Sequence, residues 1–158
     1  MLLAEELGRL LMSKGLTVAV AESCTGGKLG DMLTDVPGSS DYFLGGVISY
    51  SNDAKSNLLG VDGKTLTAKG AVSEEVAIQM AAGARRQLRA DVGVGITGIA
   101  GPTGGTPTKP VGLVYVAISS SKSSKCSRCV FKGSRSEIKT QSANRALEML
   151  REFVAYLE

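Results

Sequence analysis

Two short β-rich apolar runs, each followed at once by a cluster of glycines, constrain the fold of this chain more than any other feature. The first run, TVAVAE at residues 17–22, leads into SCTGG and then into a helical pattern. The second, DVGVGITG at residues 91–98, leads into IAGPTGGTPTKP. Short apolar runs of this kind are typical of strands buried in a parallel sheet. Because open α/β sheets bind ligands at the carboxyl ends of such strands, we expect both glycine clusters to line one crevice.

Helical and β-type patterns alternate along the rest of the chain. A leucine stripe predicts a helix over residues 2–14, and Ser73 is positioned to cap an amphipathic helix over 74–88. Residues 61–72 form a turn-rich connection in this interpretation. We expect further helices over 28–36, 51–60 and 136–157, and strands over 42–50, 111–121 and 124–132. The fold class is therefore α/β: a single three-layer α/β/α domain over 1–158, on a mixed, partly parallel sheet with an antiparallel hairpin near the C-terminus.

The chain contains no histidine, which excludes histidine triads and histidine metal sites. Any acid/base chemistry must use Lys, Tyr, Cys, Ser or a carboxylate. Aromatic residues make up only 4% of the sequence and the net charge is +3, a composition that disfavours base stacking and nucleic-acid binding. We expect no metal, no other cofactor and no nucleic-acid partner.

The segment at the start of the sequence is apolar but carries Glu5, Glu6 and Arg9 at helical spacing, which is typical of an amphipathic helix rather than a signal peptide. No run of about 18 apolar residues could span a bilayer. The three cysteines are an odd number, and reduced thiols are the default inside the cell. We expect a cytoplasmic protein without a membrane partner.

Cys126 and Cys129 form a CxxC pattern. They lie in a β-like stretch, where residues three apart point to opposite faces. A second CxxC and the histidines that could complete four zinc ligands are also absent. A structural role is the favoured interpretation of this pair.

Neither common nucleotide motif is satisfied. Gly93, Gly95 and Gly98 spell GxGxxG, but they lie inside the predicted strand instead of after it. The pattern around Gly26 also departs from a P-loop, because Glu22 stands where glycine is needed and Leu29 where Ser or Thr must bind magnesium.

The SCTGG turn offers two nucleophile candidates, Ser23 and Cys24. We expect the backbone N–H groups of Thr25, Gly26 and Gly27 to be bare, since they stand at the beginning of a helix, where negative charge is favoured. In the alternative interpretation Ser23 caps the helix and Cys24 packs into the core.

The YSNDAK segment places Tyr50 at the end of a predicted strand and Lys55 about one turn into the next helix. Without histidine, a lysine made neutral by burial is the available base for a serine. The alternative is an ordinary solvated surface lysine.

Four ordered blocks, nearly end to end, resemble the C-terminal domain of the CinA competence-damage-inducible proteins. They are AESCTGG at 21–27, PGSSDYFLGGVISYSNDAK at 37–55, GAVSEE at 70–75, and GITGIAGPTGG with KPVG between 95 and 112. Stand-alone members of this family are nicotinamide mononucleotide deamidases. The resemblance implies hydrolysis of that carboxamide to nicotinate mononucleotide and ammonia, in pyridine-nucleotide recycling.

Transferred by position, the resemblance makes Ser23 the nucleophile and Lys55 its base, with Tyr50 beside them and the N–H groups of Thr25 to Gly27 around the oxyanion. Lys109 or Arg135 would meet the phosphate. The resemblance also implies a nucleotide pocket shaped by Asn52, Thr97, Gly98, Ala100 and Gly101.

Thr97 and Thr103 differ from the Ser and Asp of many relatives, which bears on fine substrate contacts. The resemblance further implies a homo-oligomer, with a dimer favoured. The alternative function is a non-catalytic domain of the same fold that binds a nucleotide or a partner.

Overall fold

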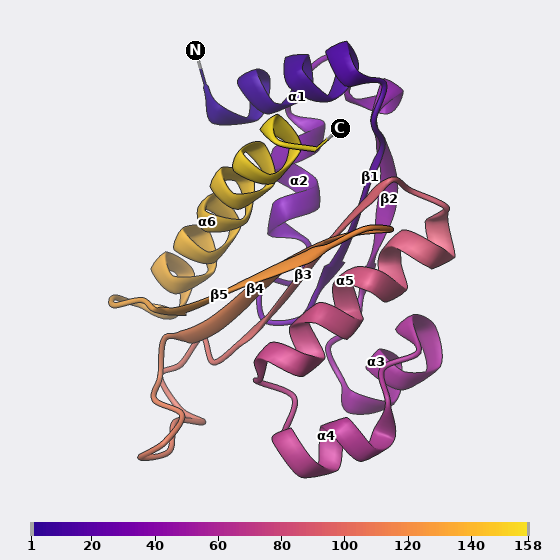
Figure 1. Cartoon of the computed structure of the whole chain (residues 1–158). Helices are drawn as coiled ribbons and strands as arrows, with labels where there is room; N and C mark the ends of the chain where they lie inside the picture. Colours follow the sequence, from indigo (N-terminus) through magenta and orange to yellow (C-terminus); the bar gives the residue numbers. More distant parts are fainter. Residues whose placement is uncertain (1, 158) are drawn as a thin grey trace.

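A central five-stranded sheet lies between two groups of helices in the computed structural model, which describes residues 2–157 (Figure 1). The elements follow one another in the order α1 Leu3–Lys14, β1 Val18–Glu22, α2 Lys28–Thr34, β2 Phe43–Ile48, α3 Asn52–Leu59, α4 Gly63–Lys69, α5 Glu74–Leu88, β3 Val92–Gly98, β4 Leu113–Ser120, β5 Ser124–Val130 and α6 Arg135–Ala155. A short 3₁₀ turn over Ser39–Asp41 precedes β2.

The sheet has the strand order β2-β1-β3-β4-β5. β1 pairs in parallel with β2 on one side and with β3 on the other, whereas β3, β4 and β5 pair antiparallel. The chain therefore leaves β1 for one neighbour and later returns to the other. The carboxyl ends of β1 and β3 flank the point where the strand order reverses, which is where open α/β sheets form a crevice.

Helix α5 packs closely against the sheet because the residues between them are small. Ala77 and Ala81 of α5 pack with Ala117 of β4 in the core. A Cβ atom on Gly93 would overlap the carbonyl oxygen of Ala81, and one on Gly95 would overlap that of Ala77. Gly93 and Gly95 of the GxGxxG pattern thus serve close helix packing, whereas a Cβ atom on Gly98 would meet Leu113 and Val114 of β4 instead.

Replacing Gly93 with alanine is expected to lower the free energy of unfolding by roughly 2 kcal/mol or more, because neither the helix backbone nor the strand can yield easily. Gly63, in α4, offers a matched control, since nothing lies near its missing Cβ and its φ is not positive. Gly63→Ala should be neutral or stabilising by about 0.5–1 kcal/mol. Urea unfolding curves measure both. Equal stability of the two variants would contradict the close packing of α5.

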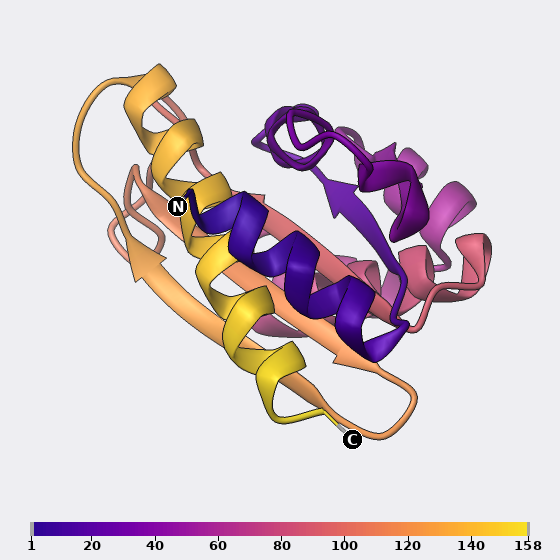
Figure 2. The ribbon, with the colours of Figure 1, turned by 90° about the horizontal axis from the view of Figure 1, so that it is seen from above.

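The other face of the sheet is covered by α1, α2 and α6, with α1 packed along α6 (Figure 2). Large aliphatic side chains fill this layer, among them Leu7 and Leu11 of α1 and Leu147 and Leu150 of α6. Ser134 and Glu137 form a capping box at the beginning of α6, which fixes where this helix starts. The start of α6 is brought to the same edge of the sheet as the carboxyl ends of β1 and β3.

The predicted fold class is confirmed: two helical layers enclose a mixed, partly parallel sheet that ends in the β4–β5 hairpin. The turn-rich connection predicted for 61–72 is wrong in part, because α4 forms there. Asp62 caps α4 by accepting from the N–H of Lys64, and none of its residues is buried. A helix without a buried face has no apolar periodicity to reveal it. Among the described residues, no helix is both long and apolar enough to cross a membrane.

Candidate active site

Ser23 stands directly after β1, at the carboxyl edge of the sheet. Its backbone N–H donates to the carbonyl of Ile96 in β3 over 3.0 Å, so the strand pairing holds the residue in place beyond the end of β1. Its side chain lies in the cleft, and the residue is 7% exposed. The hydroxyl of Ser23 is therefore held in a defined position and shielded from most solvent.

The Lys55 amine lies 3.0 Å from the Ser23 hydroxyl, although the two residues are 32 positions apart in the chain. Ser51 caps α3 by accepting from the N–H of Ala54, which fixes the start of the helix that carries Lys55. Lys55 is only 2% exposed, so the prediction of a buried lysine is favoured over the solvated alternative. Its amine also lies 2.9 Å from the carbonyl oxygen of Ser49 and 3.1 Å from that of Tyr50.

Burial lowers the pKa of the Lys55 amine below its ordinary value. No carboxylate among residues 2–157 forms an ion pair with it, and a charged group without a counter-ion is costly to bury. As an ammonium it donates to all three oxygens. As a neutral amine it can donate to the carbonyls of Ser49 and Tyr50 and accept from the Ser23 hydroxyl. This geometry aims the lone pair of Lys55 at the proton of Ser23.

Glu22, the last residue of β1, occupies the helix terminus that the sequence suggested was open. Its carboxylate accepts from the N–H groups of Gly27, Leu29 and Gly30. The N–H of Gly26 donates to the carbonyl of Ser23. The expectation that Gly26 and Gly27 present bare N–H groups is therefore wrong, because a buried carboxylate and a turn carbonyl already accept from them.

Thr25 is almost fully buried, and its hydroxyl donates to Glu22 over 2.6 Å. None of the three residues Thr25, Gly26 and Gly27 lines the cleft. The alternative in which Ser23 caps α2 also fails, since the Glu22 carboxylate accepts from the first-turn N–H groups instead.

Cys24 packs into the core that α1, α2 and α6 share with the sheet, while one side of it reaches the cleft. Burial raises the pKa of its thiol to about 11. Because the thiolate is the nucleophilic form, the environment disfavours Cys24 and favours Ser23 as the nucleophile.

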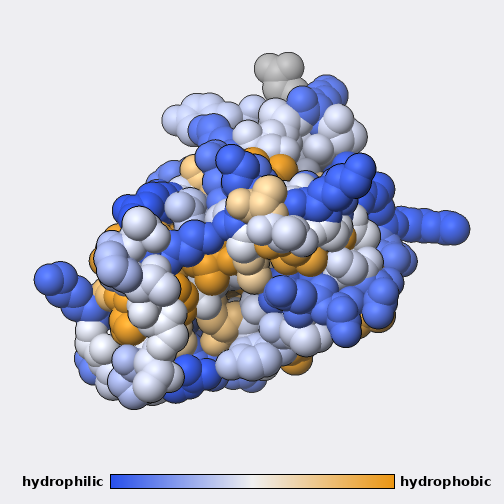
Figure 3. Space-filling view, turned by 90° about the horizontal axis from the view of Figure 1, so that it is seen from below, coloured by the Kyte–Doolittle hydropathy of each residue, from blue (hydrophilic) through white to orange (hydrophobic). Residues whose placement is uncertain are grey.

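A cleft of about 250 Å³ opens over Ser23 and Lys55. Seen from below, the molecule shows hydrophobic residues gathered in a central hollow with a hydrophilic rim (Figure 3). The cleft brings together nine of the predicted site residues, namely Ser23, Tyr50, Asn52, Lys55, Thr97, Gly98, Ala100, Gly101 and Arg135. The convergence of the two glycine-rich segments on one crevice is only partial, because the second segment lines it whereas Gly26 and Gly27 do not.

Arg135 ties two walls of the cleft together. It is the first residue of α6, and its guanidinium donates to the carbonyl of Gly101 over 2.7 Å and to the Tyr50 hydroxyl over 3.1 Å. Both acceptors are neutral, so they leave the positive charge of Arg135 uncompensated at the cleft. Such a guanidinium can bind an anionic group of a ligand.

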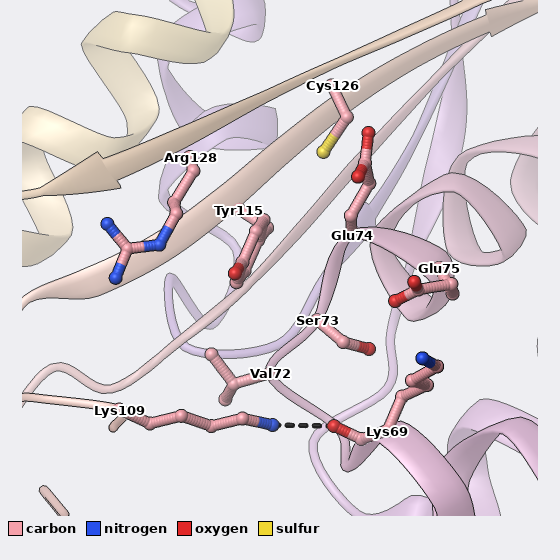
Figure 4. Close-up of a pocket in the computed structure, with 9 residues that line it drawn as sticks. All are labelled: Lys69, Val72, Ser73, Glu74, Glu75, Lys109, Tyr115, Cys126 and Arg128. Carbon is pink, nitrogen blue, oxygen red and sulfur yellow. Dashed lines mark hydrogen bonds between the residues drawn. The ribbon is translucent and has the colours of Figure 1, made fainter. Parts of the chain in front are cut away.

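Lys109 lies outside this cleft. Its amine donates to the carbonyl of Lys69 over 2.6 Å, and it lines a second cavity of about 460 Å³ together with Glu74, Tyr115 and Arg128 (Figure 4). Val72 lines both cavities and separates them. Of the two cations predicted for a phosphate, only Arg135 is brought to the cleft.

Sequence reasoning missed several cleft residues. Ala71 and Val72 come from the connection before α5, and the hydroxyl of Thr97 donates to the Ala71 carbonyl over 2.9 Å. The only signal for them was their place inside GAVSEE. Ile99 and Gly104 belong to the long loop after β3, whose path the sequence does not specify.

The two cysteines of the CxxC pattern point to opposite faces of β5, as predicted. Cys126 is paired with Ala117 and lines the second cavity, whereas Cys129 is paired with Val114. Both are free thiols. Over residues 2–157, no cluster of three His, Cys, Asp or Glu residues is arranged to hold a metal ion.

Fold and site together define a class: α/β proteins with a buried serine–lysine pair at the switch point of a mixed sheet. The chain belongs to the CinA C-terminal domain family, whose match covers residues 2–154. It is 54% identical over 143 residues to a Moorella thermoacetica protein named for competence-damage induction, covering 90% of this chain and 34% of that one. It is 62% identical over 97 residues to a CinA-like protein of a Cyanothece strain, covering 61% and 23%.

Two solved structures are similar over nearly their whole length. The competence/damage inducible protein CihA of Agrobacterium tumefaciens is 43% identical, with a TM-score of 0.88 over 95% of this chain and 94% of that one. Competence damage-inducible protein A (ComA) of Klebsiella pneumoniae is 32% identical, with a TM-score of 0.95 over 99% and 97%. By contrast, the chain spans about a third or less of the curated relatives it matches.

Proposed function

We propose that this protein is an amidohydrolase that converts nicotinamide mononucleotide to nicotinate mononucleotide and ammonia. The observation that carries the proposal is the contact of the Ser23 hydroxyl with the Lys55 amine, buried without a counter-ion at the base of a cleft. A binding module has no use for a buried amine that lies against a serine hydroxyl and whose pKa is lowered by burial, whereas a serine nucleophile requires a base. Family membership supports the substrate class.

The first half of the reaction forms an acyl-enzyme. The Ser23 oxygen attacks the carboxamide carbon while the neutral amine of Lys55 takes the hydroxyl proton. A tetrahedral intermediate forms, and its oxyanion needs hydrogen-bond donors, each worth about 3 kcal/mol. The N–H groups of Gly26 and Gly27 already have acceptors and Thr25 does not line the cleft, so this proposal assigns none of the three expected donors to the oxyanion. Lys55 then passes its proton to the leaving nitrogen, the C–N bond breaks, and ammonia departs.

The second half regenerates the enzyme. Water adds to the ester carbon as Lys55 accepts one of its protons, the bond to the Ser23 oxygen breaks, and that oxygen recovers a proton from Lys55. The products are a carboxylic acid, which ionises, and free enzyme. Every proton is moved by Lys55, so the mechanism needs neither histidine nor a metal.

Arg135 is the residue we assign to the phosphate of the substrate. Its guanidinium reaches the cleft next to Tyr50, and no carboxylate of residues 2–157 forms an ion pair with it. Asn52 and Thr97 line the same cleft, where they can contact the remainder of the nucleotide. Lys109 is not assigned to the phosphate, because it lies on the other side of Val72.

The experiment is an assay of purified protein with nicotinamide mononucleotide, in which ammonia and nicotinate mononucleotide are both quantified. We expect the two products in equal amounts. Nicotinamide riboside, which has the same carboxamide but no phosphate, should show a raised KM because it lacks the group that Arg135 binds. Tight binding of nicotinamide mononucleotide by folded protein without either product would favour the non-catalytic alternative and contradict the proposal.

A further inference from the structure

Glu22 is the most completely buried carboxylate near the cleft, and the proposed mechanism assigns it no step. It is 1% exposed. One of its oxygens accepts from the Thr25 hydroxyl at 2.6 Å and from the N–H groups of Gly27 and Leu29 at 3.2 and 3.0 Å. The other oxygen accepts from the N–H of Gly30 at 2.9 Å.

Four donors on one carboxylate satisfy a group that would otherwise be costly to bury. Gly27, the N-cap of α2, has no side chain and adopts a φ of 112°, so the helix cannot be capped from its own N-cap position. Glu22 provides that cap from the end of β1. The turn that carries Ser23 is therefore fixed on both sides of the nucleophile, by the strand before it and by the helix after it.

The same arrangement closes this helix terminus to ligands. The first-turn N–H groups that could donate to a negatively charged substrate group already donate to Glu22. Glu22 does not line the cleft and so has no direct contact with a substrate there. Whatever it contributes to the reaction acts through the turn over residues 23–27.

We propose that Glu22 is a positioning residue, which holds the turn over residues 23–27 so that the Ser23 hydroxyl stays within hydrogen-bond distance of the Lys55 amine. This inference rests on the proposed function, because its kcat and KM are measured with the proposed substrate. It adds to that function a residue to which neither the sequence motifs nor the family resemblance gives a role. A displacement of a catalytic group by about 1 Å can cost about a hundredfold in rate, so we expect an effect of that order.

The test compares Glu22→Gln with Asp62→Asn. Both exchange a helix-capping carboxylate for an amide, but Asp62 caps α4, which carries no cleft residue. In Glu22→Gln the amide nitrogen would face one of the backbone N–H groups that now donate to the carboxylate. Two donors would then oppose each other, and the turn over residues 23–27 would shift. We expect kcat to fall on the order of a hundredfold with KM almost unchanged, and Asp62→Asn to keep the kcat of the wild-type protein.

Thr25 supplies a second pair of variants that leaves the buried charge in place. Thr25→Val removes the hydroxyl that donates to Glu22 but keeps the shape of the side chain. It should lower kcat by about tenfold, the lower end of what loss of one hydrogen bond to a charged group costs. Thr25→Ser restores the hydroxyl and should restore kcat. This pair decides the question if Glu22→Gln does not fold.

A readout independent of the substrate separates this inference from the proposed function. The rate at which a fluorophosphonate probe labels Ser23, located by mass spectrometry, reports the activation of the hydroxyl itself. If the probe labels the wild-type protein but the protein hydrolyses no amide, the proposed substrate is overturned. The role of Glu22 still stands in that case if Glu22→Gln and Thr25→Val are labelled at least tenfold more slowly than the wild-type protein.

Three results would overturn the role of Glu22. The first is unchanged labelling and unchanged kcat in folded Glu22→Gln or Thr25→Val. The second is a loss in Thr25→Val that Thr25→Ser does not restore. The third is absence of labelling in the wild-type protein, since no activated serine would then exist to be positioned.

Discussion

Ser23→Ala is expected to lower kcat for nicotinamide mononucleotide by about a thousandfold or more, because no acyl-enzyme can form without the hydroxyl. Binding should persist, since the Ser23 side chain is one small part of the cleft and Arg135 remains in place. Steady-state release of ammonia measures the first effect. Isothermal titration with nicotinamide mononucleotide measures the second.

Ser39→Ala is the matched control for this variant. Ser39 is a buried serine of similar exposure, 9% against 7%, but it lies outside the cleft. It should therefore retain the activity of the wild-type protein. Cys24→Ala completes the set, because activity that survives in Ser23→Ala and disappears in Cys24→Ala would show that the neighbouring thiol is the nucleophile.

Lys55→Arg is expected to be nearly inactive, with a loss on the order of a thousandfold. The guanidinium of arginine stays charged at any accessible pH and cannot take the proton of Ser23. Lys55→Met, which has a similar length and no charge, should be equally inactive. An active Lys55→Arg protein would contradict the assignment of Lys55 as the base.

The pH dependence of the wild-type protein follows from the same residue. Because burial lowers the pKa of Lys55, kcat/KM should rise with pH through one ionisation whose midpoint lies below the usual value of about 10.4. The Cys24 thiol, with a pKa of about 11, stays protonated across that rise. Stability should also depend on pH, since the unfolded chain binds the proton of Lys55 more tightly than the folded chain does.

The sign of this stability effect is fixed by linkage. The contribution of Lys55 to the free energy of unfolding is fully present above its unfolded pKa and is lost as the pH falls through its lowered folded pKa. Lys55→Met has no such proton to bind. Urea unfolding at several pH values should therefore show Lys55→Met gaining stability relative to the wild-type protein as the pH decreases. A pH-independent difference would mean that Lys55 titrates normally.

The secondary structure could be predicted wherever the pattern was strong. The leucine stripe of α1 and the Ser73 cap of α5 each mark a helix that the structure confirms. α4 was missed because none of its residues is buried. A helix held by one capping carboxylate and by contacts along α5 carries no periodic pattern that a reading of the sequence could detect.

The candidate site was predictable in part. Ser23 follows β1 and Lys55 lies about one turn into α3, so their places at the sheet edge could be expected from the order of strands and helices. The acceptor of each backbone N–H group could not be predicted in this way. Gly26 and Gly27 were expected to face a ligand, but Glu22 and the Ser23 carbonyl accept from them instead.

By itself the sequence determined the order of the strands and of every helix except α4, the absence of histidine and the small set of groups able to perform acid/base chemistry, because these depend on composition and local periodicity. The tertiary structure decided which of those groups meet. It placed the Lys55 amine 3.0 Å from Ser23 and turned Lys109 away to the carbonyl of Lys69. The physical reason is that such contacts join residues far apart in the chain, so they depend on strand order and on how closely the helices pack against the sheet.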